Sequence, residues 1–133
     1  MSIAENIACI RERVAKAAVR AGRNPESITV MGVSKTIAPV HIQEAFDAGL
    51  RVFGENRIQE FSGKLAQLNG LKGASWRLIG HLQSNKVRKA VEIFDGVDSV
   101  DTLRLAQKLN EAGLQVNKIL PVKASAVGTA GLV

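Results

Sequence analysis

The residues best suited to chemistry stand directly after three short apolar segments of the sequence. They are Lys35 after 28–33, the pair Glu55-Asn56 after 51–54, and the pair Gly80-His81 after 76–79. Ligands bind at the carboxyl ends of the strands in parallel α/β folds, so Lys35 is a candidate for contacting a small molecule there. The alternative is that Lys35 ends a strand and reaches solvent along its flexible stem.

An alternation of strands and helices must position these residues. The run 28–33 is apolar and β-branched without alternation, which predicts a strand buried on both faces that ends at Lys35. Helical spacing of apolar residues and turn residues between segments predict the other elements. The expected helices are 3–21, 39–48, 58–68, 84–94 and 103–113, and the other expected strands are 51–54, 76–80, 96–101 and 119–122. Ser84 is predicted to cap the fourth helix, Asp101 or Thr102 to cap the fifth, and Gly113 to close it.

Strands that alternate with helices at this spacing predict a parallel α/β sheet of about five strands. Such a sheet is either an open doubly wound domain or part of a (β/α)₈ barrel, which takes about 250 residues when complete. Polar residues after three successive strands favour the barrel, because all strand tips of a barrel face one common mouth. The expected domain covers residues 1–122, and the small residues of 123–133 predict a poorly ordered tail.

Composition limits the classes of protein and partner. The 133 residues are 46% hydrophobic, which fits one globular domain, and no apolar run is long enough to span a bilayer. The N-terminus lacks a signal-peptide pattern, so we expect a cytoplasmic protein without a membrane partner. The net charge of +6 allows anionic partners, but dispersed basic residues and only 4% aromatic residues disfavour nucleic acid. Cys9 is the only cysteine, which excludes an internal disulfide, and we expect it in the core.

Four motifs occur together in an order and spacing that resemble one family. They are Val33-Ser34-Lys35-Thr36, Phe53-Gly54-Glu55-Asn56 with Gln59-Glu60, Trp76 with Ile79-Gly80 and Leu82-Gln83-Ser84-Asn85-Lys86, and Ser99-Val100-Asp101. Over about residues 3–122 the chain resembles the pyridoxal-phosphate homeostasis proteins, also called YggS-like proteins. The resemblance implies a (β/α)₈ barrel related to the N-terminal domain of alanine racemases, of which this chain is the N-terminal portion.

The resemblance also implies a cofactor, pyridoxal 5′-phosphate (PLP), at the barrel mouth. Lys35 matches the family lysine that forms a Schiff base with the PLP aldehyde. An amine attacks an aldehyde only when unprotonated, and burial at a strand tip inside a barrel favours that form. Asn56 matches the family's Gly-Glu-Asn motif and is expected near the Schiff base or the ring hydroxyl, with capping of the following helix as the alternative. Gly80 and His81 are further candidates for lining the pocket, and Arg77 stands where the family usually has histidine.

The chain departs from the family after residue 122. Members continue through three more strand-helix units whose late loops bind the phosphate, so the resemblance implies a C-terminally truncated member with weak PLP binding and open sheet edges that favour self-association. The implied function is that of a PLP carrier in PLP homeostasis, without turnover. One alternative is a truncated product without function. Another is a PLP enzyme of the racemase or decarboxylase type, which is disfavoured because such racemases use a tyrosine base and this sequence contains no tyrosine.

Overall fold

A computed structural model describes residues 1–125, in which five parallel strands form one sheet. The strands are β1 (Met31–Val33), β2 (Val52–Glu55), β3 (Ser75–Leu78), β4 (Gly96–Val100) and β5 (Val122–Ala124). Each strand pairs with the next along the chain, in the order β1-β2-β3-β4-β5. This order, with a helix in every connection, is that of part of a (β/α)₈ barrel. The predicted parallel α/β sheet is therefore confirmed.

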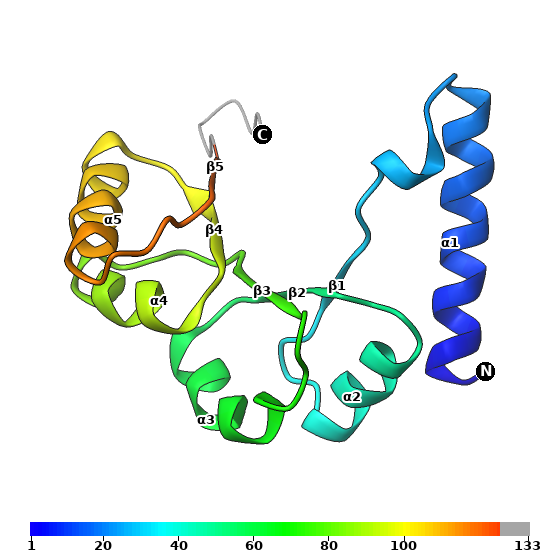
Figure 1. Ribbon diagram of the computed structural model, residues 1–133, viewed down its shortest axis with the longest axis horizontal. Helices are drawn as coiled ribbons and strands as arrows, with labels where there is room; N and C mark the ends of the chain where they lie inside the picture. Colours follow the sequence, from blue (N-terminus) through cyan, green and yellow to red (C-terminus); the bar gives the residue numbers. More distant parts are fainter. Residues whose placement is uncertain (126–133) are drawn as a thin grey trace.

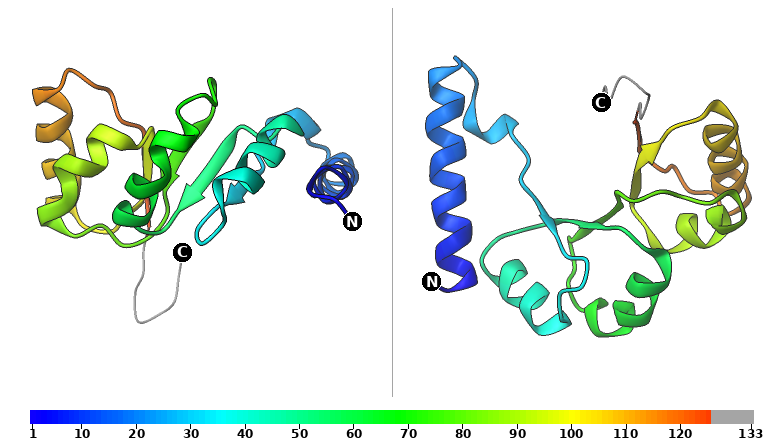
Figure 2. Two further views of the ribbon diagram at one scale, coloured as in Figure 1. Left: turned by 90° about the horizontal axis from the view of Figure 1, so that it is seen from below. Right: turned by 180° about the vertical axis from the view of Figure 1, so that it is seen from behind.

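All α-helices but the first lie on one side of the sheet. The α-helices are α1 (Ile3–Arg20), α2 (Pro39–Asp47), α3 (Ile58–Leu68), α4 (Val87–Ile93) and α5 (Leu103–Gln115), with short 3₁₀ helices η1 (Pro25–Ser27) and η2 (Ser84–Lys86). Figures 1 and 2 show α2 to α5 along the convex face of the curved sheet, while α1 lies beyond the β1 edge, next to α2. No helix of residues 1–125 covers the concave face, so the described sheet is an open arc rather than a closed barrel.

The hydrophobic core fills the space between the sheet and these helices. Side chains alternate along a strand, so in β3 Trp76 is buried against the helices while Arg77 lies on the concave face. Phe53 of β2 stacks on Trp76 with ring centroids 4.9 Å apart. Phe61 of α3 contacts both Trp76, at 5.1 Å, and Phe94 at the end of α4, at 4.8 Å. This aromatic cluster fixes α3 and α4 against the middle of the sheet.

The first strand is shorter and more exposed than the sequence predicted. β1 covers only three residues, and the Val33 side chain is 50% exposed, so the prediction of burial on both faces is wrong. The reason is its position at the edge of the described sheet, where only β2 pairs with it and the helices cover only one face. Lys35 and Thr36 follow β1 in a turn.

The helix ends agree in part with the predicted caps. Thr102 caps α5, because its hydroxyl accepts a hydrogen bond from the Leu105 amide at 3.1 Å. Ser84 does not cap α4, because it begins η2, which precedes α4. Gly113 does not close α5, which continues beyond it. A Cβ atom on Gly113 would lie 2.9 Å from the Lys118 carbonyl oxygen, so glycine at this position permits close packing of the backbone that follows the helix.

The two ends of the chain also depart from the predictions. Cys9 is exposed rather than in the core, because α1 lies outside the sheet and fully buries only Ala18. β5 begins at Val122 rather than at 119 and includes the first two residues of the predicted tail. Residues 126–133 of that tail lie outside the described residues, so the domain boundary stays a prediction. Among the described helices we find none with the length and apolar character of a bilayer span.

Candidate functional site

Lys35 lies in the turn that follows β1, at the carboxyl edge of the sheet. Its side chain is exposed, and its backbone carbonyl oxygen accepts a hydrogen bond from the Thr36 hydroxyl at 2.6 Å. The sequence predicted that a strand tip inside a barrel would bury this lysine. The described residues do not provide that burial, because the sheet is open on its concave side.

The backbone of this turn is held by β2 and α3. The Ser34 amide donates to a carbonyl oxygen of β2 at 2.9 Å, and the Ile37 amide donates to the Ser34 carbonyl oxygen at 3.1 Å. From α3, the Glu60 carboxylate accepts a hydrogen bond from the Thr36 amide. Thr36 adopts a φ of 60°, which costs free energy for a β-branched residue. These contacts fix the backbone on both sides of Lys35 while its side chain stays exposed.

A buried ion pair lies beneath the turn. Glu55, the last residue of β2, is 1% exposed, and its Oε1 lies 2.6 Å from the Nζ of Lys64 in α3. The Lys64 ammonium also donates to the carbonyl oxygens of Ser34, at 2.7 Å, and Ile37, at 3.3 Å. Burial raises the pKa of Glu55, and the hydrogen bond and positive charge of Lys64 oppose that rise. Sequence reasoning missed Lys64, although a charge among the apolar positions 61, 65 and 68 of a predicted helix was a usable signal.

Asn56 follows β2 and is partly buried. Its backbone lies against Gly80, where a Cβ atom would overlap the Asn56 carbonyl oxygen. Glycine at position 80 therefore lets the tips of β2 and β3 approach each other. The capping alternative for Asn56 is wrong, because α3 has Arg57 at its N-cap and no side-chain hydrogen bond there. The Asn56 amide is thus not committed to the helix.

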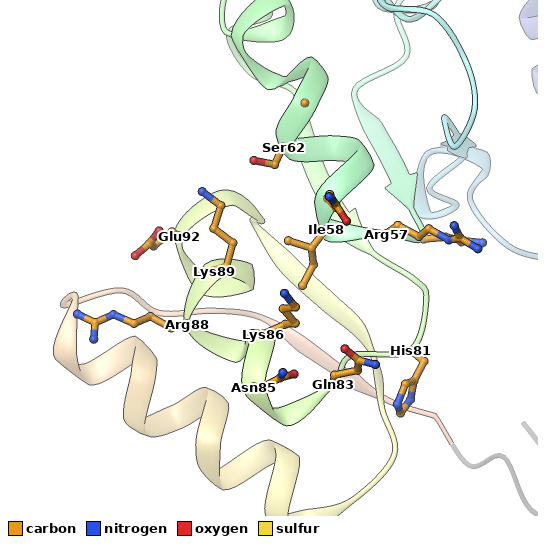
Figure 3. Close-up of a pocket in the computed structure, with 13 residues that line it drawn as sticks. Arg57, Ile58, Ser62, His81, Gln83, Asn85, Lys86, Arg88, Lys89 and Glu92 are labelled. Atoms are coloured by element: carbon orange, nitrogen blue, oxygen red, sulfur yellow. The ribbon is translucent and has the colours of Figure 1, made fainter.

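A groove between α3 and the η2–α4 segment brings together two of the predicted site residues (Figure 3). Asn56 and His81 both line this groove, which has a volume of about 960 Å³, and Lys35 does not line it. The His81 side chain is 72% exposed, and its Nδ1 lies 3.9 Å from a carboxylate oxygen of Asp101. The basic residues that line the groove are Arg57, Lys86, Arg88 and Lys89.

The concave face carries a charged pair at the position where the family histidine was expected. The Nη2 and Nε atoms of Arg77 lie 2.5 Å and 2.9 Å from Oδ1 of Asp98, and the two side chains are only 13% and 10% exposed. The hydrogen bond to Asp98 raises the pKa of Arg77. The guanidinium lies over Gly96, where a Cβ atom would overlap it. The pair therefore joins β3 to β4 and directs the charge of Arg77 toward Asp98.

Comparison with known proteins identifies relatives of this chain. No family model matches it. It is 47% identical over 111 residues to the pyridoxal phosphate homeostasis protein of Escherichia coli K12, covering 82% of this chain and 47% of that protein. It is also 47% identical over 128 residues to the pyridoxal phosphate homeostasis protein of Pseudomonas aeruginosa, covering 93% and 55%. The chain belongs to the pyridoxal phosphate homeostasis protein family. The resemblance drawn from the four motifs is confirmed.

Solved structures give the same result for the fold. PipY of Synechococcus elongatus PCC7942 is 40% identical to this chain, with a TM-score of 0.81 without PLP and 0.79 with PLP bound. The match covers 91% of this chain and 52% of PipY. The chain thus spans about half the length of the pyridoxal phosphate homeostasis proteins and of PipY. The open five-stranded sheet of residues 1–125 is accordingly a partial barrel, as predicted.

The residues at the strand tips suit one end of PLP. The Lys35 amine suits attack on an aldehyde carbon, and the Asn56 amide is both a donor and an acceptor of hydrogen bonds. The two residues follow adjacent strands at the same edge of the sheet. Phosphate sites in barrels are commonly built from the loops after strands seven and eight, and the described sheet has five strands. The described residues therefore fit the aldehyde end of PLP rather than its phosphate end.

Proposed function

We propose that this chain supplies the amine-bearing part of a PLP-binding protein of intracellular PLP homeostasis. Lys35 holds PLP as a Schiff base, and Asn56 contacts it from the tip of β2. The observation that carries the proposal is the geometry of the turn, whose backbone is fixed by β2 and α3 while the Lys35 side chain is exposed at the carboxyl edge. The names of the relatives and the structure of PipY with PLP bound support it.

PLP and this chain would supply different reactive groups. PLP, when bound, supplies the aldehyde and the conjugated ring, and this chain supplies an amine held in a fixed direction. Exposure of Lys35 gives the aldehyde access to the amine, whereas cover by further residues would favour the neutral, reactive form of a lysine. Because the residues described here offer no loop of the usual phosphate-binding kind, we expect weak binding that depends little on the phosphate.

We further propose that the protein carries PLP without turnover. Its relatives are named for homeostasis of PLP and not for a reaction. The check is incubation of the PLP-loaded chain with single enantiomers of amino acids. We expect no racemised or decarboxylated product above the rate of free PLP, and a rate that depends on the protein would contradict carriage without turnover.

The binding proposal is tested by titrating the chain with PLP while recording the visible absorbance of the Schiff base. We expect a saturable signal that is lost in Lys35→Ala and kept in Lys72→Ala, a matched change at another exposed lysine. 5′-Deoxypyridoxal, which lacks the phosphate and cannot form a hemiacetal with its own aldehyde, should give an affinity similar to that of PLP. If Lys35→Ala binds as the wild type does, the assignment of Lys35 is wrong. If the wild type shows no saturable signal, this chain alone holds no PLP site.

A further inference from the structure

The strongest feature outside the proposed PLP contacts is the position of Lys64. Its side chain is only 10% exposed, and its Nζ lies within reach of oxygen atoms from three elements. Two are the carboxylates of Glu55, at 2.6 Å, and Glu60, at 3.7 Å. The others are the backbone carbonyl oxygens of Ser34, at 2.7 Å, and Ile37, at 3.3 Å. One buried cation therefore connects β2, α3 and the turn that carries Lys35.

The carbonyl groups that Lys64 binds belong to the first and last residues of the turn 34–37. The amide between them, that of Thr36, donates to Glu60, which is itself an ion-pair partner of Lys64. Thr36 has a φ of 60°, so the turn adopts a conformation that it would leave without external support. Lys64 and Glu60 thus hold the turn by its own backbone groups on both sides of Lys35.

The charges around Lys64 explain why a lysine is tolerated at a buried helix position. Glu55 faces it from β2 and Glu60 from one helical turn earlier in α3, and the turn contributes the carbonyl oxygens of Ser34 and Ile37. A buried charge is stable only when it is paired and hydrogen-bonded, which these groups provide. Neither carboxylate oxygen of the buried Glu55 has a hydrogen bond of good geometry among residues 1–125, and its closest charged contact is the ion pair with Lys64 at 2.6 Å. Its stability in the core therefore depends on Lys64.

We propose that Lys64, together with Glu55 and Glu60, is the positioning group of the site: it fixes the turn 34–37 and thereby sets the direction in which Lys35 presents its amine to an aldehyde. The proposal deepens the proposed function and rests on it for the identity of the aldehyde as PLP. The hydrogen bonds of Lys64 and Glu60 to the turn 34–37 are present in the chain without any ligand. The tests of the proposal therefore begin with the unloaded protein.

The first measurement is amide hydrogen exchange at Thr36 and Ile37 in the unloaded chain. Glu60→Gln keeps the size of the side chain but weakens the charge-assisted acceptor of the Thr36 amide, so we expect exchange at that amide to rise roughly tenfold. Glu55→Gln with Lys64→Met removes the Glu55–Lys64 pair and the hydrogen bonds of Lys64 to the Ser34 and Ile37 carbonyl oxygens, so we expect exchange at the Ile37 amide to rise. Lys16→Met, which breaks a surface pair with Glu12, is the matched control and should change neither amide.

The second measurement is competitive labelling of lysines by a small aldehyde without phosphate, followed by reduction and peptide mapping. The ratio of label on Lys35 to label on Lys72 reports the presentation of Lys35 within each molecule. We expect this ratio to change several-fold in Glu60→Gln and in the double variant, with the far-ultraviolet circular dichroism unchanged in Glu60→Gln.

Unchanged exchange and an unchanged labelling ratio in folded Glu60→Gln would overturn the proposal. That variant decides the outcome even if the double variant fails to fold. Failure of the proposed function looks different, because in that case PLP would not select Lys35 in the wild type while the exchange of the turn would still respond to Glu60→Gln.

Discussion

Removal of Arg77 should destabilise the fold by leaving the carboxylate of Asp98 without its main partner. The two side chains are 13% and 10% exposed, and two guanidinium nitrogens lie 2.5 Å and 2.9 Å from one carboxylate oxygen. Loss of one member of a buried pair costs roughly 3–5 kcal/mol in other proteins. Two features lower the value here: Lys123 lies 3.9 Å from Asp98, and the side chains of the pair keep 13% and 10% of their surface exposed. We therefore expect Arg77→Met to lower the free energy of unfolding by about 2–4 kcal/mol.

The companion changes distinguish an ion pair from simple packing. Asp98→Asn should cost about 1–3 kcal/mol, because the Arg77 guanidinium regains water more easily than a buried carboxylate does. The double variant Arg77→Met with Asp98→Asn should cost less than the two single changes added together, with a coupling of roughly 2 kcal/mol. Lys16→Met, at a surface pair whose side chains are 67% exposed, should cost less than about 1 kcal/mol.

Urea unfolding followed by tryptophan fluorescence measures these values. Trp76 is the only tryptophan, is 7% exposed and precedes Arg77 in β3, so its emission reports the packing of this strand. A cost for Arg77→Met as small as that of Lys16→Met, or strictly additive single and double changes, would refute the reasoning. In that case the pair would behave as a solvent-screened surface interaction.

Three further predictions follow from the core and the strand tips. Burial raises the pKa of Glu55 above its unfolded value of 4.5, so the contribution of Glu55 to the free energy of unfolding should be complete below pH 4.5 and should be lost as pH rises through the folded pKa. The measurement is urea unfolding at a series of pH values, compared with Glu55→Gln. Parallel curves of stability against pH for the two proteins would contradict the prediction. Phe61→Ala should lower the free energy of unfolding by about 3–5 kcal/mol, because the ring is fully buried between two aromatic rings. Val33→Ala, at an exposed position, should lower it by less than about 1 kcal/mol. Equal losses in urea unfolding would contradict the stabilising role of the aromatic cluster. Gly80→Ala should destabilise the protein by about 1–3 kcal/mol, because the added Cβ atom overlaps the backbone at the tip of β2. Gly63→Ala, in open space within α3, should stabilise it by about 0.5–1 kcal/mol. Shifts of the same sign in thermal unfolding would contradict the close approach of the β2 and β3 tips.

The sequence predicted the parallel sheet and its helices because these elements are determined by residues close together in the sequence. Apolar spacing specifies helices such as α3 and α5, and a hydroxyl before a helix specifies a cap such as Thr102. The open concave face and the exposed edge strand β1 were not predictable, because burial of a strand depends on how many neighbours it receives. Cys9 was placed in the core for the same reason: helical periodicity shows which face is apolar, but not whether another element covers it.

The candidate site likewise contains residues that the sequence predicted and residues that it did not. Lys35 and Asn56 were found from their places after strands and from the family motifs, and both lie at the predicted edge of the sheet. Lys64 was missed because its partners are 27 and 30 residues away, in the turn after β1, and only the fold brings them together. The pairing of Arg77 with Asp98 across 21 residues was missed on the same ground.

The most direct test of the central claim is borohydride reduction of the chain in the presence of a limiting amount of PLP, followed by peptide mass mapping. We predict that the reduced adduct lies on Lys35 and that the Lys35→Ala variant yields no dominant modified peptide. Adducts spread over several exposed lysines, with the same pattern in Lys35→Ala, would contradict the claim that this chain presents Lys35 as the PLP-binding amine.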